Sequence, residues 1–281
     1  MSIANFTKHC RKIVCVGRNF AEHAKELNNP VRTSLKIPLL SHSYSRPCPC
    51  PESRFLLIAL ITDIIRKPPV HTYLNRQYKT LILCIATSPV LFLKPPSSFL
   101  LPGAGSIEMP IGCTNLHHEV ELGVVIGKGG RDIPVASAMS HVSGYFLGLD
   151  MTAREVQEEA KKKGLPWSIA KGMDTFAPVS ALIPASAVTN TANVDLWLDV
   201  NGKQRQRGNT GDMLFGVPQL VAHISTLFTL EEGDCIFTGT PAGVGPVVVG
   251  DTITCGAVDK QTGKTLATIT VGVAKRLQAK L

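Results

Sequence analysis

The sequence predicts a β-rich α+β domain. Short apolar or alternating runs, bounded by turn residues, recur through the chain after residue 88. Few segments have the composition of a helix, and many strands with few helices favour an α+β fold over a doubly wound parallel sheet. With 281 residues and 44% hydrophobic side chains, the chain can form one substantial core. We therefore expect a single domain spanning residues 1–281.

The expected strands are runs of buried or alternating residues that end at turn residues. Asn201-Gly202 follows one of them and predicts a two-residue hairpin, because Asn-Gly readily adopts the positive φ of a type I′ turn. The expected strands are 12–17, 119–126, 143–149, 194–200, 234–238, 251–255 and 266–273.

Two longer helices and one short one are expected. The charged segment 152–163 stops at Gly164, a typical C-terminal capping residue. The segment 217–228 has Pro218 near its first turn, where a missing N–H costs little. Residues 19–27 are expected to form one or two turns of helix.

Residues 31–87 differ in periodicity and charge from the rest of the chain. They show no sustained periodicity and hold eight lysines or arginines against Glu52 and Asp63, so +6 of the formal net charge of +8 lies there. An irregular segment of this length is unusual inside a compact domain. We expect an atypical insertion, irregular or disordered, and hypothesise that it derives from translated intron or a gene-model error. Abundant native peptides from this interval would contradict that hypothesis, and a peptide joining Pro30 to the Ser88 region would support it.

Composition argues against several classes of protein. The basic charge is confined to one segment, and no nucleic-acid-binding motif accompanies it. The longest apolar runs, 55–61 and 81–86, are far shorter than the roughly 20 residues of a membrane helix. The eight cysteines are scattered, which indicates free thiols in a reducing compartment. The first twenty residues carry four basic and no acidic side chains, which is compatible with a short mitochondrial presequence.

Acidic side chains in apolar strands form the first candidate site. Glu119 and Glu121 are two residues apart and would share one face of a strand. Another apolar strand ends at Asp150, which could supply a third carboxylate. Three carboxylates with water or substrate oxygens suit a hard cation such as Mg²⁺ or Mn²⁺. A solvated strand face is the alternative for the Glu-x-Glu pair.

Two further stretches have catalytic potential. His23 and Glu26 are neighbours on a helix, and a carboxylate beside an imidazole suits a general base acting on water. The glycine-rich run from Thr238 to Pro246 could direct main-chain N–H groups at an anion, and Thr240 adds a hydroxyl. A surface helix and a structural turn are the respective alternatives.

These stretches, in this order, resemble the fumarylacetoacetate hydrolase family. The resemblance rests on VGRNFAEHAKEL, PVLFLKP, NLHHEVELGVVIGK, LDMTAREVQEEAKKKGLPW and LEEGDCIFTGTPAGVGPV, and it covers nearly all of residues 11–30 and 88–274. LDMTARE narrows it to a mitochondrial branch whose members hydrolyse acylpyruvates and decarboxylate oxaloacetate. Relatives have only a few residues where this chain has residues 31–87.

The resemblance implies a β-sandwich roll with short helices, a mobile N-terminal lid helix and, usually, a homodimer. It implies a metal, Mg²⁺ or alternatively Mn²⁺, held by the three carboxylates. It also implies mitochondrial localisation, with the cytosol as the alternative. His117 and His118 belong to the motif, but we expect them to pack and hydrogen-bond rather than bind metal. The implied metal ligands are Glu119, Glu121 and Asp150; the catalytic residues His23, Glu26 and Lys171; the substrate contacts Arg18, Gln157, Lys171 and Thr240.

The expected activity is magnesium-dependent cleavage of small 2-oxo acids through a metal-bound pyruvate enolate. His23, oriented by Glu26, would activate water for acylpyruvate hydrolysis, whereas decarboxylation of oxaloacetate needs no water. Lys171 would stabilise the developing charge, or would instead form a structural salt bridge. Three alternatives remain: oxaloacetate keto–enol tautomerisation in the same pocket, a non-catalytic binding protein whose lid the insertion holds open, and a nucleic-acid or membrane-surface protein that uses the basic insertion.

Overall fold

The structure is a computed structural model that describes residues 6–20, 22 and 88–277. All of these residues belong to one compact unit. The insertion 31–87 lies outside the described residues, as does most of the helix expected over 19–27.

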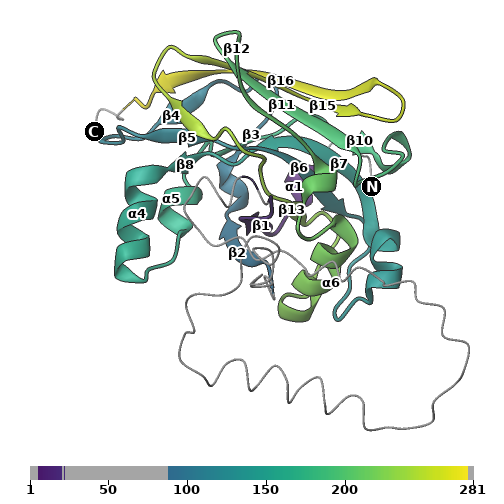
Figure 1. Cartoon of the computed structure of the whole chain (residues 1–281). Helices are drawn as coiled ribbons and strands as arrows, with labels where there is room; N and C mark the ends of the chain where they lie inside the picture. Colours follow the sequence, from purple (N-terminus) through teal and green to yellow (C-terminus); the bar gives the residue numbers. More distant parts are fainter. Residues whose placement is uncertain (1–5, 21, 23–87, 278–281) are drawn as a thin grey trace, which may run out of the picture. The chain divides into compact units, whose positions relative to one another are not determined.

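Two main β-sheets form the body of this unit, with a three-stranded and a two-stranded sheet beside them (Figure 1). The six-stranded sheet has the order β10 (Ile183–Pro184), β7 (Val142–Leu149), β6 (Val120–Ile126), β13 (Cys235–Phe237), β1 (Ile13–Gly17) and β2 (Val90–Lys94). The five-stranded sheet has the order β12 (Lys203–Asn209), β11 (Val194–Val200), β15 (Thr252–Asp259), β16 (Lys264–Lys275) and β4 (Ile107–Met109). The smaller sheets are β14 (Gly245–Val247), β5 (Leu116–His118) and β8 (Thr152–Ala153), and β3 (Phe99–Leu100) with β9 (Ala177–Pro178).

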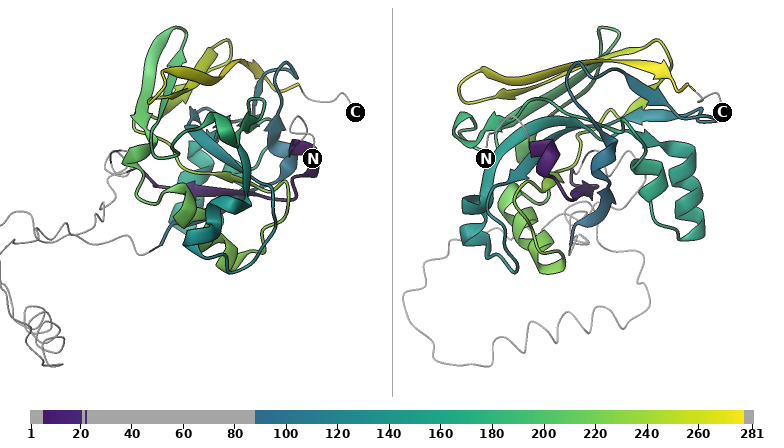
Figure 2. Two further views of the ribbon diagram at one scale, coloured as in Figure 1. Left: turned by 90° about the vertical axis from the view of Figure 1, so that its right-hand side faces the viewer. Right: turned by 180° about the vertical axis from the view of Figure 1, so that it is seen from behind.

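Short helices flank the sheets. In Figure 1 and in the right-hand view of Figure 2, α4 and α5 lie on one flank of the molecule and α6 on the other. Among the described residues, the α-helices are α1 (Phe6–His9), α4 (Arg154–Lys163), α5 (Ser168–Lys171) and α6 (Val217–Leu227), and the 3₁₀ helices are η2 (Pro96–Ser98), η3 (Val135–His141), η4 (Ala185–Ala187) and η5 (Thr210–Asp212). The β-rich α+β fold class predicted from the sequence is confirmed.

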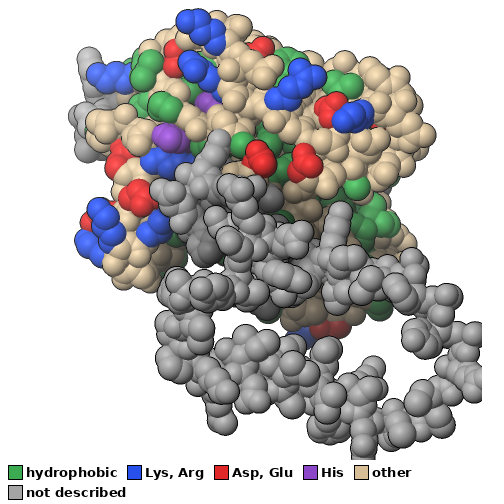
Figure 3. All heavy atoms as spheres, in the orientation of Figure 1, with side chains coloured by type: hydrophobic (Ala, Val, Ile, Leu, Met, Phe, Trp, Pro, Cys, Tyr) green, Lys and Arg blue, Asp and Glu red, His purple; other side chains and the backbone are tan. Residues whose placement is uncertain are grey.

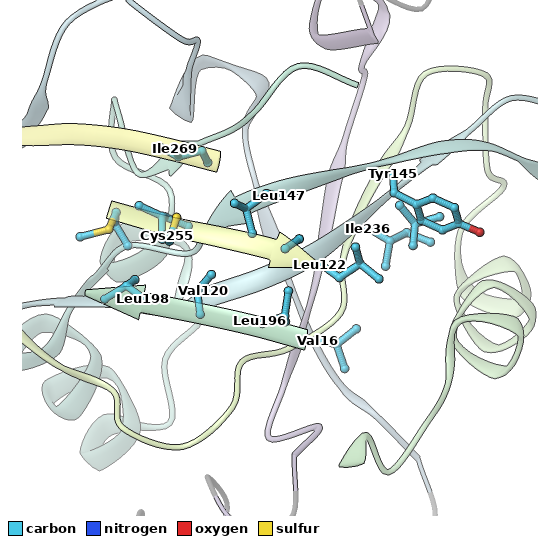
Figure 4. Packing of buried hydrophobic residues seen from close by; sticks show 14 of the residues in the cluster. Val16, Val120, Leu122, Tyr145, Leu147, Leu196, Leu198, Ile236, Cys255 and Ile269 are labelled. Atoms are coloured by element: carbon cyan, nitrogen blue, oxygen red, sulfur yellow. The ribbon is translucent and has the colours of Figure 1, made fainter. Parts of the chain in front are cut away.

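The core lies between the two large sheets. Burial alternates along β11, so that its inward side chains pack towards the six-stranded sheet. Figure 4 shows Val120 and Leu122 of β6 close to Leu196 and Leu198 of β11. Every residue of β6 is buried, because a second cluster around Phe146 covers its other face. β6, which carries Glu121, is thus shielded from water on both faces.

Several local predictions are confirmed. The hairpin between β11 and β12 has φ of 52° at Asn201 and 72° at Gly202, as a type I′ turn requires. Helix α4 ends at Gly164, whose φ is 66° and whose N–H donates to the carbonyls of Ala160 and Lys161. Pro218 lies in the first turn of α6.

One predicted strand begins one residue too early, at a position that affects the site. The strand expected over 119–126 is observed as β6, which starts at Val120, and Glu119 lies between β5 and β6. β5 pairs with β8 and β14, whereas β6 pairs with β7 and β13, so the chain changes partners at Glu119. A change of sheet partner leaves no trace in the alternation of a single strand.

On the face drawn in Figure 3, lysines and arginines of the described residues lie at separate places, with acidic side chains among them. In the part of the chain that the structure describes, no helix is long and apolar enough to cross a bilayer.

Candidate metal and substrate site

Three buried carboxylates lie together where β6 and β7 pair. One oxygen from each of Glu119, Glu121 and Asp150 lies within 4.8 Å of the others. The antiparallel pair Val120 with Leu149 brings Asp150, the residue after β7, opposite Glu119, and the Asp150 N–H donates to the Glu119 carbonyl at 2.8 Å. The sequence placed these residues as a possible cluster, and the fold brings them together. Their role as metal ligands stays a prediction.

Three buried cations contact two of these carboxylates. The Lys171 ammonium lies 3.0 Å from Glu119 Oε2 and 2.6 Å from Asp150 Oδ2. The Lys94 ammonium lies 2.8 Å from Asp150 Oδ1, and Arg154 lies 2.5 Å from Glu119 Oε1. The three positive groups equal the three carboxylates in formal charge, but their ion pairs are all with Glu119 and Asp150.

Glu121 is the carboxylate that lacks a cationic partner among the described residues. It accepts a hydrogen bond from the Gly239 N–H at 2.6 Å and is only 1% exposed. Burial, together with the negative charges of Asp150 and Glu119, raises its pKa well above the ordinary value. A buried carboxylate without an ion pair is costly, and a bound cation would reduce that cost. The oxygen-only donor set fits a hard divalent metal.

A cavity opens beside this cluster. It is small, with a volume of about 20 Å³, and is partly open to solvent. Three of the residues that sequence predicted for substrate contact or catalysis, Arg18, Gln157 and Lys171, meet at this cavity. Its lining consists of Gly17, Arg18, Phe92, Glu119, Arg154, Gln157, Lys161, Trp167 and Lys171.

Arg18 is held in a left-handed backbone conformation, with φ of 61°. Such a conformation is uncommon for residues other than glycine and needs support from its surroundings. Asn19 supplies that support: its side-chain NH₂ donates to the carbonyls of Phe215 and Thr238, and its side-chain oxygen accepts from the Phe215 N–H. Asn19 is 1% exposed and thereby fixes the start of the segment that leads to the predicted lid.

Lys94 is a site residue that sequence reasoning missed. Its ammonium also donates to the carbonyls of Met151, Phe176 and Lys171. It is 1% exposed, so it acts as a fixed buried charge that joins Asp150 to the segment carrying Lys171. The available signal was a lysine at the end of the apolar run VLFLK, directly before two prolines.

Arg154 was also missed. Besides its ion pair with Glu119, it donates to the side-chain oxygen of Gln157 at 2.7 Å, one turn further along α4. Because that oxygen is taken, a substrate contact of Gln157 would use its NH₂ group. The spacing of three residues on a predicted helix was the signal for this pair.

Thr240 and the two histidines have other partners in the structure. The Thr240 hydroxyl hydrogen-bonds Val120 and Gln206, and Thr240 does not line the cavity described above. His118 Nδ1 lies 2.9 Å from Gln206 Oε1, and His117 Nε2 lies 2.7 Å from Asn115 Oδ1. Burial lowers the pKa of His117 to about 4, so this side chain is neutral at neutral pH.

His23 and Glu26, the predicted general base and its orienting carboxylate, lie outside the described residues. Their roles stay predictions.

The chain is similar to known proteins over most of its length. Residues 79–273 match the domain described as fumarylacetoacetate (FAA) hydrolase C-terminal. A mitochondrial oxaloacetate decarboxylase of Dictyostelium discoideum is 45% identical over 246 residues, which cover 88% of each chain. A mitochondrial oxaloacetate tautomerase of Homo sapiens is 39% identical over 254 residues, which cover 90% of each chain.

The chain is also similar to solved structures. A fumarylpyruvate hydrolase from Pseudomonas aeruginosa, in complex with Mn²⁺ and pyruvate, is 31% identical with a TM-score of 0.69, covering 95% of this chain and 91% of that one. The yeast protein ynq8, a fumarylacetoacetate hydrolase family protein, is 30% identical with a TM-score of 0.71, covering 98% of each chain. The chain belongs to the fumarylacetoacetate hydrolase family.

Proposed function

We propose that this protein is a metal-dependent enzyme that breaks the C3–C4 bond of small 2-oxo acids and releases pyruvate. The observation that carries the proposal is the buried cluster of Glu119, Glu121 and Asp150 beside a cavity lined by Arg18, Gln157 and Lys171. The names of the relatives, which include oxaloacetate decarboxylase and fumarylpyruvate hydrolase, support the substrate class. The reactions are acylpyruvate hydrolysis, oxaloacetate decarboxylation, or both.

Glu119, Glu121 and Asp150 would hold the metal, which we propose to be Mg²⁺, with Mn²⁺ as the alternative. When bound, the ion supplies Lewis-acid chemistry that favours negative charge on the 2-oxo oxygen. Lys94, Lys171 and Arg154 already balance the three carboxylates. A divalent cation therefore adds two positive charges to a neutral buried site, and a dianion such as oxaloacetate would restore neutrality. Charge balance thus favours binding of metal and dianionic substrate together.

Cationic and amide groups of the cavity would orient the substrate. Arg18 and the Gln157 NH₂ group are suited to its carboxylate, because both donate hydrogen bonds. Thr240 would contribute from the loop after β13. Phe92 and Trp167, whose ring centroids lie 5.7 Å apart, form an apolar part of the wall.

Bond cleavage leaves an electron pair on C3, which is delocalised to the 2-oxo oxygen as pyruvate enolate. Lys171 lines the cavity as a buried ammonium and would stabilise that charge. In hydrolysis, His23, oriented by Glu26, would take a proton from water as its oxygen attacks the C4 carbonyl, giving a carboxylic acid. In decarboxylation, C4 leaves as CO₂ without water. Protonation of C3 then gives pyruvate in both reactions.

Oxaloacetate keto–enol tautomerisation is a second candidate, favoured by the names of the plant and mammalian relatives. It transfers a proton between C3 and the 2-oxo oxygen and breaks no carbon–carbon bond. Conversion of the enol, followed by its ultraviolet absorbance, separates it from pyruvate release. Enol conversion without pyruvate formation would assign the chain to this activity.

We also propose a homodimeric, mitochondrial protein. The exposed apolar side chains Val90 and Leu93 on the edge strand β2, with Ile169 on neighbouring α5, support self-association. The names of several relatives, which include the word mitochondrial, support the location. Light scattering during size-exclusion chromatography and import into isolated mitochondria test the two points.

The Glu121→Ala variant tests the proposed site directly. It should retain its circular dichroism spectrum and lose metal-dependent pyruvate release from oxaloacetate. Full activity of this variant would exclude the carboxylate cluster as the catalytic centre.

A further inference from the structure

Gln206 is a fully buried amide on β12, a strand of the five-stranded sheet, and it hydrogen-bonds the backbone of Val120, which lies between Glu119 and Glu121. It is 0% exposed, although its strand neighbours are exposed. Its Oε1 lies 3.1 Å from the Val120 nitrogen and 2.9 Å from His118 Nδ1. Its Nε2 lies 2.8 Å from the Thr240 hydroxyl and 2.9 Å from the Pro241 carbonyl. All four hydrogen-bonding positions of the amide, two on the oxygen and two on the nitrogen, are thus engaged within the fold.

Two main-chain groups determine the orientation of this amide. The Val120 N–H can only donate, and the Pro241 carbonyl can only accept. Exchanging the amide oxygen and nitrogen of Gln206 would place two donors together at Val120 and two acceptors together at Pro241. The orientation with Oε1 towards Val120 is therefore the one that satisfies every partner.

This orientation sets the hydrogens of two neighbouring side chains. His118 faces an acceptor oxygen, so its Nδ1 carries the hydrogen and, in the neutral ring, its Nε2 is a bare acceptor. Gln206 donates to the Thr240 hydroxyl, whose single hydrogen donates to the Val120 carbonyl at 2.8 Å. The Thr240 hydroxyl can therefore offer a substrate only a lone pair, and a Thr240 contact with a carboxylate would use its main-chain N–H.

The network holds both main-chain polar groups of Val120. Its N–H donates to Gln206 and its carbonyl accepts from Thr240. Val120 lies between Glu119 and Glu121, where the chain changes sheet partners. The directions in which the side chains of Glu119 and Glu121 leave the backbone depend on the conformation of Val120.

We propose that Gln206 is a positioning residue for the carboxylate site. Together with Thr240 and His118, it fixes the backbone of Val120 and so orients the side chains of Glu119 and Glu121. The inference rests on the proposed metal site. Outer hydrogen-bond partners of metal sites typically change metal affinity or activity by about 10–100-fold when they are removed.

The test is the affinity of the full chain for Mn²⁺, measured by isothermal titration calorimetry without substrate. Gln206→Met has a similar volume and no hydrogen bonds, and it should weaken Mn²⁺ binding by about 10-fold or more. Gln204→Met is the matched control, because Gln204 is an exposed residue on the same strand. The control should bind Mn²⁺ like the wild type.

Thr240 provides a second, milder variant in case Gln206→Met fails to fold. Thr240→Val should weaken Mn²⁺ binding, whereas Thr240→Ser, which keeps the hydroxyl, should bind Mn²⁺ like the wild type. The two losses should also be less than additive in the Gln206→Met, Thr240→Val double variant, since both act on the backbone of Val120 and the two side chains hydrogen-bond each other. Nitrogen chemical shifts of His118 should indicate hydrogen on Nδ1 in the wild type and change in Gln206→Met.

The outcomes separate this inference from the proposed function. Wild-type affinity in folded Gln206→Met, or in Thr240→Val, would overturn the positioning role. A wild-type chain that binds no Mn²⁺ would instead contradict the proposed metal site.

Discussion

At the residue scale, the site depends on charged side chains that are largely buried. Lys94, Lys171 and Arg154 reach Glu119 and Asp150 from three separate segments of the chain. Removing one partner of such a buried ion pair lowers the stability of the fold sharply, because the other charge remains buried. Lys94 does not line the cavity described above, so it can be varied without removing a predicted substrate contact.

Lys94→Met should lower the free energy of unfolding by about 3–5 kcal/mol, since Asp150 loses a buried partner and three carbonyls lose a donor. Urea denaturation measures the change. Lys162→Met, at an exposed position on α4, is the control and should change stability by less than about 0.5 kcal/mol. Equal effects of the two variants would show that the Lys94 contacts do not stabilise the fold.

Glu121→Gln should separate stability from metal binding. The amide can keep the hydrogen bond from Gly239 and removes a buried charge that has no cationic partner among the described residues. Without metal, the variant should therefore be at least as stable as the wild type, while its affinity for Mn²⁺ falls by more than about 100-fold. Thermal unfolding with EDTA and with excess Mn²⁺ measures both effects. Undiminished stabilisation of the variant by Mn²⁺ would argue against Glu121 as a ligand.

The same carboxyl predicts a pH dependence for the metal-free protein. Its folded-state pKa is raised above the ordinary value of 4.5, so the folded state binds the proton more tightly than the unfolded state. The wild type should therefore lose stability relative to Glu121→Gln as the pH rises above about 4.5 towards the folded-state pKa. Below that window the difference should vanish. Unfolding free energies measured at several pH values with EDTA test this, and a gap that narrows with rising pH would contradict it.

At the scale of elements, the loop after β13 fixes the geometry of Glu121. Gly239 has φ of 100°, and a Cβ there would lie 2.8 Å from the Cβ of Asn19. Only glycine combines this conformation with the close approach of Asn19 and a hydrogen bond to Glu121.

Gly239→Ala should therefore weaken Mn²⁺ binding and lower stability by more than backbone strain alone. Gly250→Ala is a closely matched control, because Gly250 has φ of 97° and open space around its missing Cβ. The control should lose about 1–2 kcal/mol from strain and keep its metal affinity. Calorimetry and urea denaturation of the two variants give the comparison. Equal losses in both would show that the contact with Asn19 has no effect.

The elements also show what the sequence could predict. Alternation and turn residues predicted β1, β7 and β11 nearly residue for residue, because each keeps one pattern along its length. β12 was predicted only as the second arm of a hairpin, since its residues KQRQRGN are polar and Gln206 alone is fully shielded among them in a strand at the sheet edge. The roles of Gln206 and Lys94 depend on contacts between distant segments, which no local pattern records.

At the scale of the whole molecule, the two large sheets are joined by side-chain hydrogen bonds as well as by their apolar core. Gln206 of the five-stranded sheet hydrogen-bonds the backbone that leads into β6 of the six-stranded sheet. The carboxylate cluster was predictable because the Glu-x-Glu spacing and the acid after β7 are visible in the sequence. The balancing cations Lys94 and Arg154 were not, because their pairing with the carboxylates arises only when the sheets assemble.

Removal of residues 31–87 tests the organisation of the chain as a single catalytic domain with an insertion. The described residues form their compact unit without this segment. We expect the shortened chain to fold and to retain or gain pyruvate-releasing activity. A shortened chain that folds but has lost activity would show that the insertion contributes to the catalytic domain.

The most direct test of the central claim is Mg²⁺-dependent release of pyruvate from oxaloacetate and acetylpyruvate by the full-length chain, compared with Glu121→Ala and with EDTA. Our account predicts that pyruvate forms from at least one of the two substrates, that EDTA abolishes its release and added Mg²⁺ restores it, and that Glu121→Ala is inactive. Pyruvate release that continues in EDTA and in Glu121→Ala, or no release from either substrate by a folded, metal-loaded chain, would contradict it.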